Sequence, residues 1–292
     1  MIRLLHLCSR ISNANTRRFH NSSCVLYVWE PYKQDYPIKY DEVEKPIKLS
    51  LLGRFKAGCN DIKREGSLFL KEMRDFFRVY PTMIVPEVED IIWKFDGTKE
   101  CRNQWVLSCD SDYNEGYSTA KLEFTNSGTG LFHGHISTRI PKDGKIGRAG
   151  YCNIMTVPKT KSFHRKSMYD FSSYNTLVLR IRGDGRCYML NVLQRGHLDL
   201  TRDFCYHYLM YTSGGPYWQH VKIPFAKLVF AIKGGVQIHQ KPMPTALVTN
   251  FGITLGDKID GPFQLEIDYI AVCYDPSVLE TCAYEMVDIR KA

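Results

Sequence analysis

Apolar and polar residues alternate along most of the chain after Pro86. Such alternation places successive side chains on opposite faces of an extended chain, so it predicts β-strands with one buried face. The pattern is clearest in residues 119–125, 177–182 and 263–271. In the last of these, one buried face is expected to hold Phe263, Leu265, Ile267, Tyr269 and Ala271. Further predicted strands are Glu89–Phe95, Gln104–Cys109, Gly130–Thr138, Ala149–Val157, Cys187–Gln194, Phe204–Tyr211, Trp218–Phe225 and Val248–Leu255.

Turn sequences such as Gly183-Asp184-Gly185 and Asp260-Gly261 separate these strands, with no helical pattern between them. A series of short strands of this kind predicts an all-β, antiparallel sandwich or barrel. We place this domain at residues 87–276, followed by a C-terminal tail at 277–292.

A helical period precedes the β region. In residues 61–80, apolar residues recur at helical spacing while charged residues take most other positions. Asp61 is a suitable N-cap, and Pro81 would end the helix. The helix lies within a linker at residues 25–86, and the first part of that linker, Val25–Asn60, shows no sustained period. The helix must bury its apolar side chains on the sandwich or on a partner protein, and the predicted partner-binding residues are Leu68, Phe69, Met73, Phe76 and Phe77.

Residues 1–24 contain four arginines, several Ser and Thr residues and no acidic residue; the first acidic residue of the chain is Glu30. This composition predicts a mitochondrial transit peptide, the alternative being a basic disordered tail. A secretory signal is disfavoured because no apolar core segment follows the basic start.

The remaining charge and cysteine pattern excludes several classes of protein. Without the four arginines of residues 1–24, the formal net charge of +8 falls to about +4, which removes the main support for nucleic-acid binding. The one local basic run, residues 159–166, is interpreted as a solvated loop. The ten cysteines form no C-x-x-C pair, so neither a zinc site nor a disulfide framework is indicated. No stretch is apolar for long enough to predict a transmembrane helix.

Two pairs of residues could form a metal site or a nucleophilic site, and one glycine requires a special backbone conformation. His133 and His135 share a strand face, but no further ligand lies nearby in sequence, so polar packing is favoured over a metal site. Cys205 and His207 also share a face, yet no orienting third group is identifiable, and we predict no catalysis there. Gly185 is interpreted as a hairpin residue that needs a positive φ.

Trp218 and His220 share a strand face with Lys222. A Trp on such a face can stack on a sugar because its ring offers apolar area with little conformational freedom to lose. Core packing of Trp218 is favoured over this role. If a relict ligand-binding face is present, its predicted residues are Trp218 and His220.

Three strings in order resemble the thirty-kilodalton complex I intermediate-associated protein family: 169–186, 217–225 and 260–270. Trp93-Lys-Phe-Asp96 followed by Trp105 also resembles the start of that family's domain, and the likeness covers roughly residues 88–276. The resemblance implies a galactose-binding-like jelly roll, used as an assembly factor for NADH:ubiquinone oxidoreductase in mitochondria.

The sequence and the resemblance together lead to one expectation. The protein is expected to be a non-enzymatic, chaperone-like scaffold without a cofactor, which binds membrane-arm intermediates of complex I together with other assembly factors. It is expected on the matrix face of the inner membrane, which it reaches through its partners. The alternative is a jelly-roll module that binds a carbohydrate or another small ligand.

Overall fold

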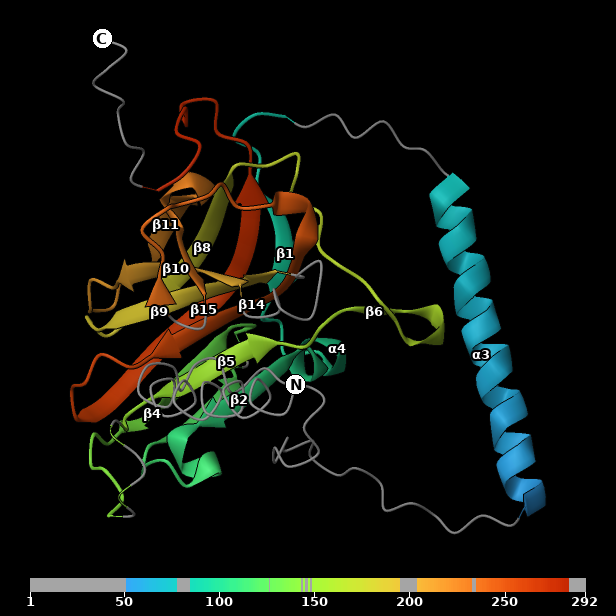
Figure 1. Ribbon diagram of the computed structural model, residues 1–292, viewed down its shortest axis with the longest axis horizontal. Coiled ribbons are helices and arrows are strands. Elements are labelled where there is room, and N and C mark those ends of the chain that lie inside the picture. Colours follow the sequence, from blue (N-terminus) through green and yellow to red (C-terminus); the bar gives the residue numbers. More distant parts are fainter. Residues whose placement is uncertain are drawn as a thin grey trace, which may run out of the picture.

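The computed structural model describes residues 51–77, 85–125, 127–142, 144, 147, 149–194, 204–232 and 235–283. The predicted transit peptide, residues 1–24, lies outside these ranges. Within them, two antiparallel sheets stack face to face, and a long helix stands beside them (Figure 1). The predicted all-β, antiparallel jelly-roll sandwich is confirmed.

Six strands form the first sheet, in which β15 pairs with β1, β4 and β8, while β11 and β3 lie at the ends of the strand order. Their bounds are β1 (Asp90–Lys94), β3 (Thr119–Phe124), β4 (Gly130–Ile136), β8 (Thr176–Arg182), β11 (Gln219–Pro224) and β15 (Gly261–Cys273).

Seven strands form the second sheet, in the order β13-β12-β10-β9-β14-β5-β2. Their bounds are β2 (Trp105–Cys109), β5 (Cys152–Thr156), β9 (Cys187–Gln194), β10 (Phe204–Tyr211), β12 (Val229–Ile232), β13 (Gly235–Val236) and β14 (Val248–Leu255).

The core lies between the inner faces of the two sheets, and aromatic rings close one part of it. Trp93 of β1 stacks on Phe251 of β14 with 5.5 Å between ring centroids, and Phe95 stacks on Trp105 of β2 at 4.8 Å. All four side chains are buried. The aromatic residues at the start of the domain therefore join the two sheets, because each pair takes one ring from the β1 region and one from the second sheet.

Strand β15 departs from the predicted alternation. Phe263, Leu265 and Ile267 belong to the core, but the register then shifts between Ile267 and Tyr269. One extra residue in a strand exchanges the faces of all residues that follow it. As a result Ile270 and Val272 point into the core between the sheets. Ala271 is buried and Tyr269 partly buried on the opposite face, so the prediction that they share the face of Phe263, Leu265 and Ile267 is wrong.

The turn at Gly185 has the backbone conformation that was predicted. Gly185 has φ +92, a region that side chains with a Cβ rarely adopt. The preceding Gly183 has a different requirement, since a Cβ there would lie 2.3 Å from Cβ of Thr212.

Helix α3 (Leu51–Phe77) begins ten residues earlier than predicted, so Asp61 lies inside it and residues 51–60 are not an extended linker. The predicted end at residues 78–80 lies outside the described residues. Helix α4 (Lys99–Asn103) and strand β12 are among the elements that were not predicted. The five-residue helix α4 is too short for a period to show, and Thr98 caps it by accepting a hydrogen bond from the amide of Cys101 at 3.2 Å. Strand β12 follows a continuous apolar run instead of an alternating one.

A small hairpin extends from the sandwich toward α3 (Figure 1). It consists of β6 (Thr160–Lys161), the turn η2 (Ser162–His164) and β7 (Arg165–Lys166). Helix α3 contacts this hairpin well away from both sheets (Figure 1).

Candidate interaction surfaces

Trp218 lies on the outer face of the six-stranded sheet, just before β11. The guanidinium groups of Arg180 and Arg182, both on β8, lie over its ring at 5.1 and 5.2 Å from the centroid. Trp218 is half-buried and does not belong to the core between the sheets. The preference for core packing of Trp218 was therefore wrong. The two guanidinium cations instead lie over its ring, whose electron-rich face attracts positive charge.

Carboxylates of β15 hold the two arginines in place. Arg182 donates from Nε to Oε2 of Glu266 at 2.9 Å, and its Nη2 also contacts that oxygen. Oε1 of Glu266 accepts a 2.7 Å hydrogen bond from the hydroxyl of Thr129. Arg180 forms an ion pair with Asp268, the residue at the register shift of β15.

His220 continues the same face on β11. Its Nε2 lies 2.8 Å from Oε1 of Glu89, whose other oxygen accepts a 2.9 Å hydrogen bond from the hydroxyl of Tyr269. The sequence placed Trp218 and His220 on one face, and both lie on this outer face. It did not identify Arg180, Arg182 or Glu89 as their neighbours, although the alternation of arginine with apolar residues in β8 already put both arginines on an outer face.

This face suits protein contact better than sugar stacking. The guanidinium groups over the Trp218 ring compete with a sugar for the ring face that they cover. Trp and Arg side chains that neighbouring residues already hold in place lose little conformational entropy on binding, and both types are enriched at the energetic centres of protein interfaces. We call Arg180, Arg182, Trp218 and His220 the Trp218 face.

The second surface is formed by α3 and the hairpin. The carboxylate of Glu72 accepts hydrogen bonds from the amide of Ser162 at 2.7 Å and from its hydroxyl at 3.0 Å, and it forms an ion pair with Arg165. The Ser162 amide is the largest cause that holds the pKa of Glu72 below its usual value. One hairpin turn thus recognises one carboxylate with three donors.

The next amide of the turn binds a second carboxylate, two helical turns earlier in α3. The amide of Phe163 donates to Oε2 of Glu65 at 2.8 Å, and Phe163 has a positive φ of 55°. Its ring packs edge-on against Phe69 with 6.2 Å between centroids. The interpretation of residues 159–166 as a solvated loop was therefore wrong, since part of this basic run docks on the helix.

The predicted partner-binding residues of α3 do not share one environment. Phe69 contacts the hairpin, and Met73 is half-buried. Leu68 and Phe77 are exposed, and the side chain of Phe76 is not among those described. The structure therefore divides this group between a hairpin contact and exposed positions, and it shows no packing of α3 on a sheet face in the described residues.

Cys205 and His207 lie side by side on the outer face of the seven-stranded sheet, with 3.7 Å between Sγ and Nδ1. Asn191 lies 2.6 Å from the same Nδ1, and its amide nitrogen donates to Thr254, so its oxygen accepts the proton of His207. Nδ1 is then a donor and cannot take a proton from the thiol. Burial raises the pKa of Cys205 and lowers that of His207 to about 4, the opposite of what an activated thiol requires.

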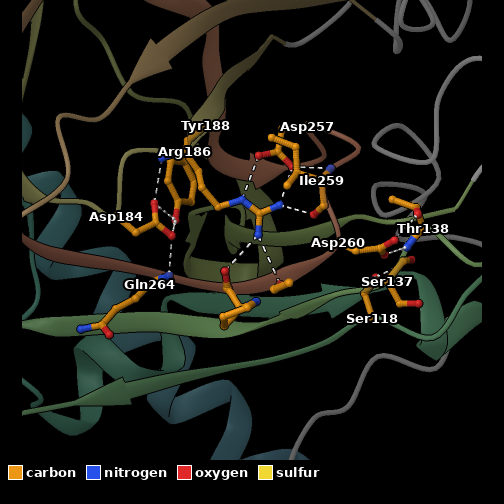
Figure 2. Close-up of polar contacts among 12 residues, drawn as sticks. Ser118, Ser137, Thr138, Asp184, Arg186, Tyr188, Asp257, Ile259, Asp260 and Gln264 are labelled. Carbon is orange, nitrogen blue, oxygen red and sulfur yellow. Dashed lines mark hydrogen bonds and ion pairs between the residues drawn. The ribbon is translucent and has the colours of Figure 1, made fainter.

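A network around Arg186 fixes the loop between β14 and β15 (Figure 2). Arg186 donates to both oxygens of Asp257, at 2.8 and 2.6 Å, and also to backbone carbonyls of Ile259 in the loop and of Pro262 at the start of β15, the latter at 3.1 Å. On the other side of the turn, Asp184 accepts a hydrogen bond from the amide of Gln264 at 2.8 Å. These contacts join the β8–β9 turn to β15 and set the register of the strand that carries Glu266 and Asp268.

His133 lies on the outer face of the first sheet, with 3.5 Å between its Nε2 and Oε2 of Glu123. Among the described residues, no three His, Cys, Asp or Glu side chains are grouped to hold a metal ion.

In the part of the chain that the structure describes, no helix combines the length and the apolar character needed to cross a membrane.

Solved structures that partly match the chain include carbohydrate-binding modules. A family 11 module from Clostridium thermocellum, in complex with a mixed-linked tetrasaccharide, has a TM-score of 0.42 and 13% sequence identity, over 64% of this chain and 96% of the module. A family 30 carbohydrate-binding module has a TM-score of 0.35 and 14% identity, over 72% of this chain and 94% of the module.

Sequence comparisons give a much stronger result. The model of the family described as complex I intermediate-associated protein 30 matches residues 93–267. The protein named complex I intermediate-associated protein 30, mitochondrial, of Drosophila melanogaster is 40% identical over 279 residues, which cover 94% of this chain and 92% of the fly protein. The Mus musculus protein of the same name is 40% identical over 203 residues, which cover 69% of this chain and 61% of the mouse protein. The chain belongs to the complex I intermediate-associated protein 30 family.

Proposed function

We propose that this protein is a non-catalytic assembly factor of mitochondrial respiratory complex I, which binds membrane-arm intermediates together with other assembly factors. The observation that carries the proposal is the 40% identity, over 94% of the chain, to a mitochondrial complex I intermediate-associated protein. A match of that extent includes the strands that build both sheets.

The geometry supports a binding role. The pair with the composition of a nucleophilic site, Cys205 and His207, has the wrong hydrogen bonding and the wrong pKa shifts for that chemistry. The Trp218 face, in contrast, presents Trp and Arg side chains held by carboxylates on a rigid sheet. We assign this face to contact with an assembly partner.

The proposed location is the matrix face of the inner membrane. It is supported by the names of the relatives, which call them mitochondrial, and by the acid-free, arginine-containing residues 1–24. Membrane-arm intermediates are embedded in that membrane, so a scaffold that binds them works at its surface.

The Trp218 face can be tested apart from the fold. Trp218→Ala removes the ring but no core contact, whereas Trp93→Ala removes a buried ring that joins the sheets. We expect Trp218→Ala to accumulate normally and to lose co-purification with complex I intermediates, while Trp93→Ala loses abundance as well. Normal co-purification with Trp218→Ala would show that this face is not the partner contact.

A further inference from the structure

The two edges of α3 differ in charge. Glu65 and Glu72 lie on the edge that faces the hairpin, where amides and Arg165 bind them. On another edge Lys63, Leu70 and Arg74 recur at spacings of seven and four residues, which brings them to one side of the helix. The hairpin therefore occupies the acidic edge and leaves the basic edge of α3 open to its surroundings.

Apolar side chains lie beside these basic residues. Ile62 and Leu70 both expose 67% of their surface, and Lys63, Lys71 and Arg74 are exposed as well. Two large aliphatic side chains at that exposure have little contact with the rest of the protein. Long basic side chains next to them can keep their charge in water while their stems cover apolar surface.

The hairpin adds to the positive charge of this part of the molecule. The sequence of α3 and the hairpin, residues 51–77 and 159–166, contains ten Lys and Arg residues but four Asp and Glu residues. Two of those four acidic residues, Glu65 and Glu72, are the ones bound by the hairpin. Two segments that are far apart in the sequence thus form one basic unit, which stands away from the sandwich (Figure 1).

We propose that α3 and the β6–β7 hairpin bind the surface of an anionic phospholipid membrane. Leu70 and Ile62 enter the headgroup region, Lys63 and Arg74 on the same edge as Leu70 contact lipid phosphates, and Lys71, farther round the helix, adds to the electrostatic attraction. A helix with an apolar stripe beside Lys and Arg binds in the plane of such a surface, through apolar burial and attraction to anionic lipid. This inference goes beyond the proposed function, in which the protein reaches the membrane through its partners.

Co-sedimentation of the full chain with vesicles tests the inference. The vesicles are phosphatidylcholine alone or phosphatidylcholine with cardiolipin, and binding is compared between variants because residues 1–24 are common to all of them. The test variant is Lys63→Glu, Lys71→Glu, Arg74→Glu. The matched control reverses three exposed charges on the sandwich, Lys99→Glu, Lys121→Glu, Lys222→Glu.

Wild type and control should bind the cardiolipin vesicles and bind phosphatidylcholine alone much more weakly. The test variant should lose roughly a hundredfold or more in partitioning, since each basic residue near an anionic surface contributes roughly fivefold. Ile62→Ser, Leu70→Ser should weaken binding to the same vesicles without changing its salt dependence.

Four outcomes would overturn the inference. One is equal binding of wild type and test variant, and another is an equal loss in test variant and control. The third is a test variant that still binds vesicles but no longer co-purifies with complex I intermediates from detergent extracts, which would make this edge a protein contact. The fourth is a wild-type protein that does not bind the cardiolipin vesicles, which would refute the lipid contact and leave the proposed function, tested in cells, intact.

Discussion

Nδ1 of His207 donates a 2.6 Å hydrogen bond to Oδ1 of Asn191 on the neighbouring strand, and burial lowers the pKa of the imidazole to about 4. In the unfolded chain the same group titrates near pH 6.5, so the unfolded state binds more protons between these values. Stability is then lost as the pH falls from about 6.5 to about 4, by up to about 3 kcal/mol. Chemical denaturation of wild type and His207→Gln at neutral and acidic pH measures this loss. It should be clearly smaller in the variant, and equal pH dependence would contradict the buried neutral imidazole.

The Gly185 turn should tolerate no branched side chain. Because Gly185 has φ +92, Gly185→Val places a Cβ in a strained conformation, and we expect a loss of about 2 kcal/mol or more in the free energy of unfolding. Gly66→Ala is the control, because this glycine lies in α3 with nothing within 4 Å of an added Cβ, so it should leave stability unchanged or slightly raise it. Thermal unfolding of both variants is the measurement, and an unaffected Gly185→Val would refute the turn assignment.

Arg186 should not be replaceable by lysine. Its side chain is 11% exposed and binds Asp257 through two nitrogens, whereas Arg180 is 45% exposed in its pair with Asp268. A lysine keeps the charge but cannot reproduce the forked contact, so Arg186→Lys should cost about 2–3 kcal/mol. Arg180→Lys should cost at most about 1 kcal/mol. Denaturant titrations compare the two, and similar costs would show that burial of Arg186 does not matter.

Loss of the Cys205 thiol should leave function intact. Cys205 packs in a small buried cluster with Met155 and Leu193, so Cys205→Ala should cost about 1 kcal/mol of stability as a small cavity. Complementation of cells that lack the protein, with abundance measured in parallel, checks the effect. Failure to restore complex I at normal abundance would reinstate a chemical role for this residue.

Strands such as β3 could be predicted because their two faces differ in burial, which leaves a period of two in the sequence, whereas β5 and β14 are buried on both faces. The register shift in β15 left no such trace, since Tyr269 and Ala271 are apolar although they leave the core side. The early start of α3 was missed for a different reason. Gly53 and Gly58 lower the helix propensity of residues 51–60, which argues against a helix in that segment.

The candidate surfaces were predicted less completely than the fold. Trp218 and His220 were placed on one face, but the carboxylates that hold their neighbours come from β15, far away in the sequence. The contact between Glu72 and Ser162 joins residues separated by 90 positions. A period along one segment carries no information on such pairs, and only the packing of the elements reveals them.

The central claim is that this protein serves the assembly of one respiratory complex through its binding surfaces. Its most direct test is native-gel analysis of mitochondria from cells that lack the protein, with the assembled respiratory complexes and their intermediates quantified. We predict a marked loss of assembled complex I, accumulation of membrane-arm intermediates and nearly normal amounts of the other complexes. A normal amount of assembled complex I in cells wholly without the protein would contradict the account.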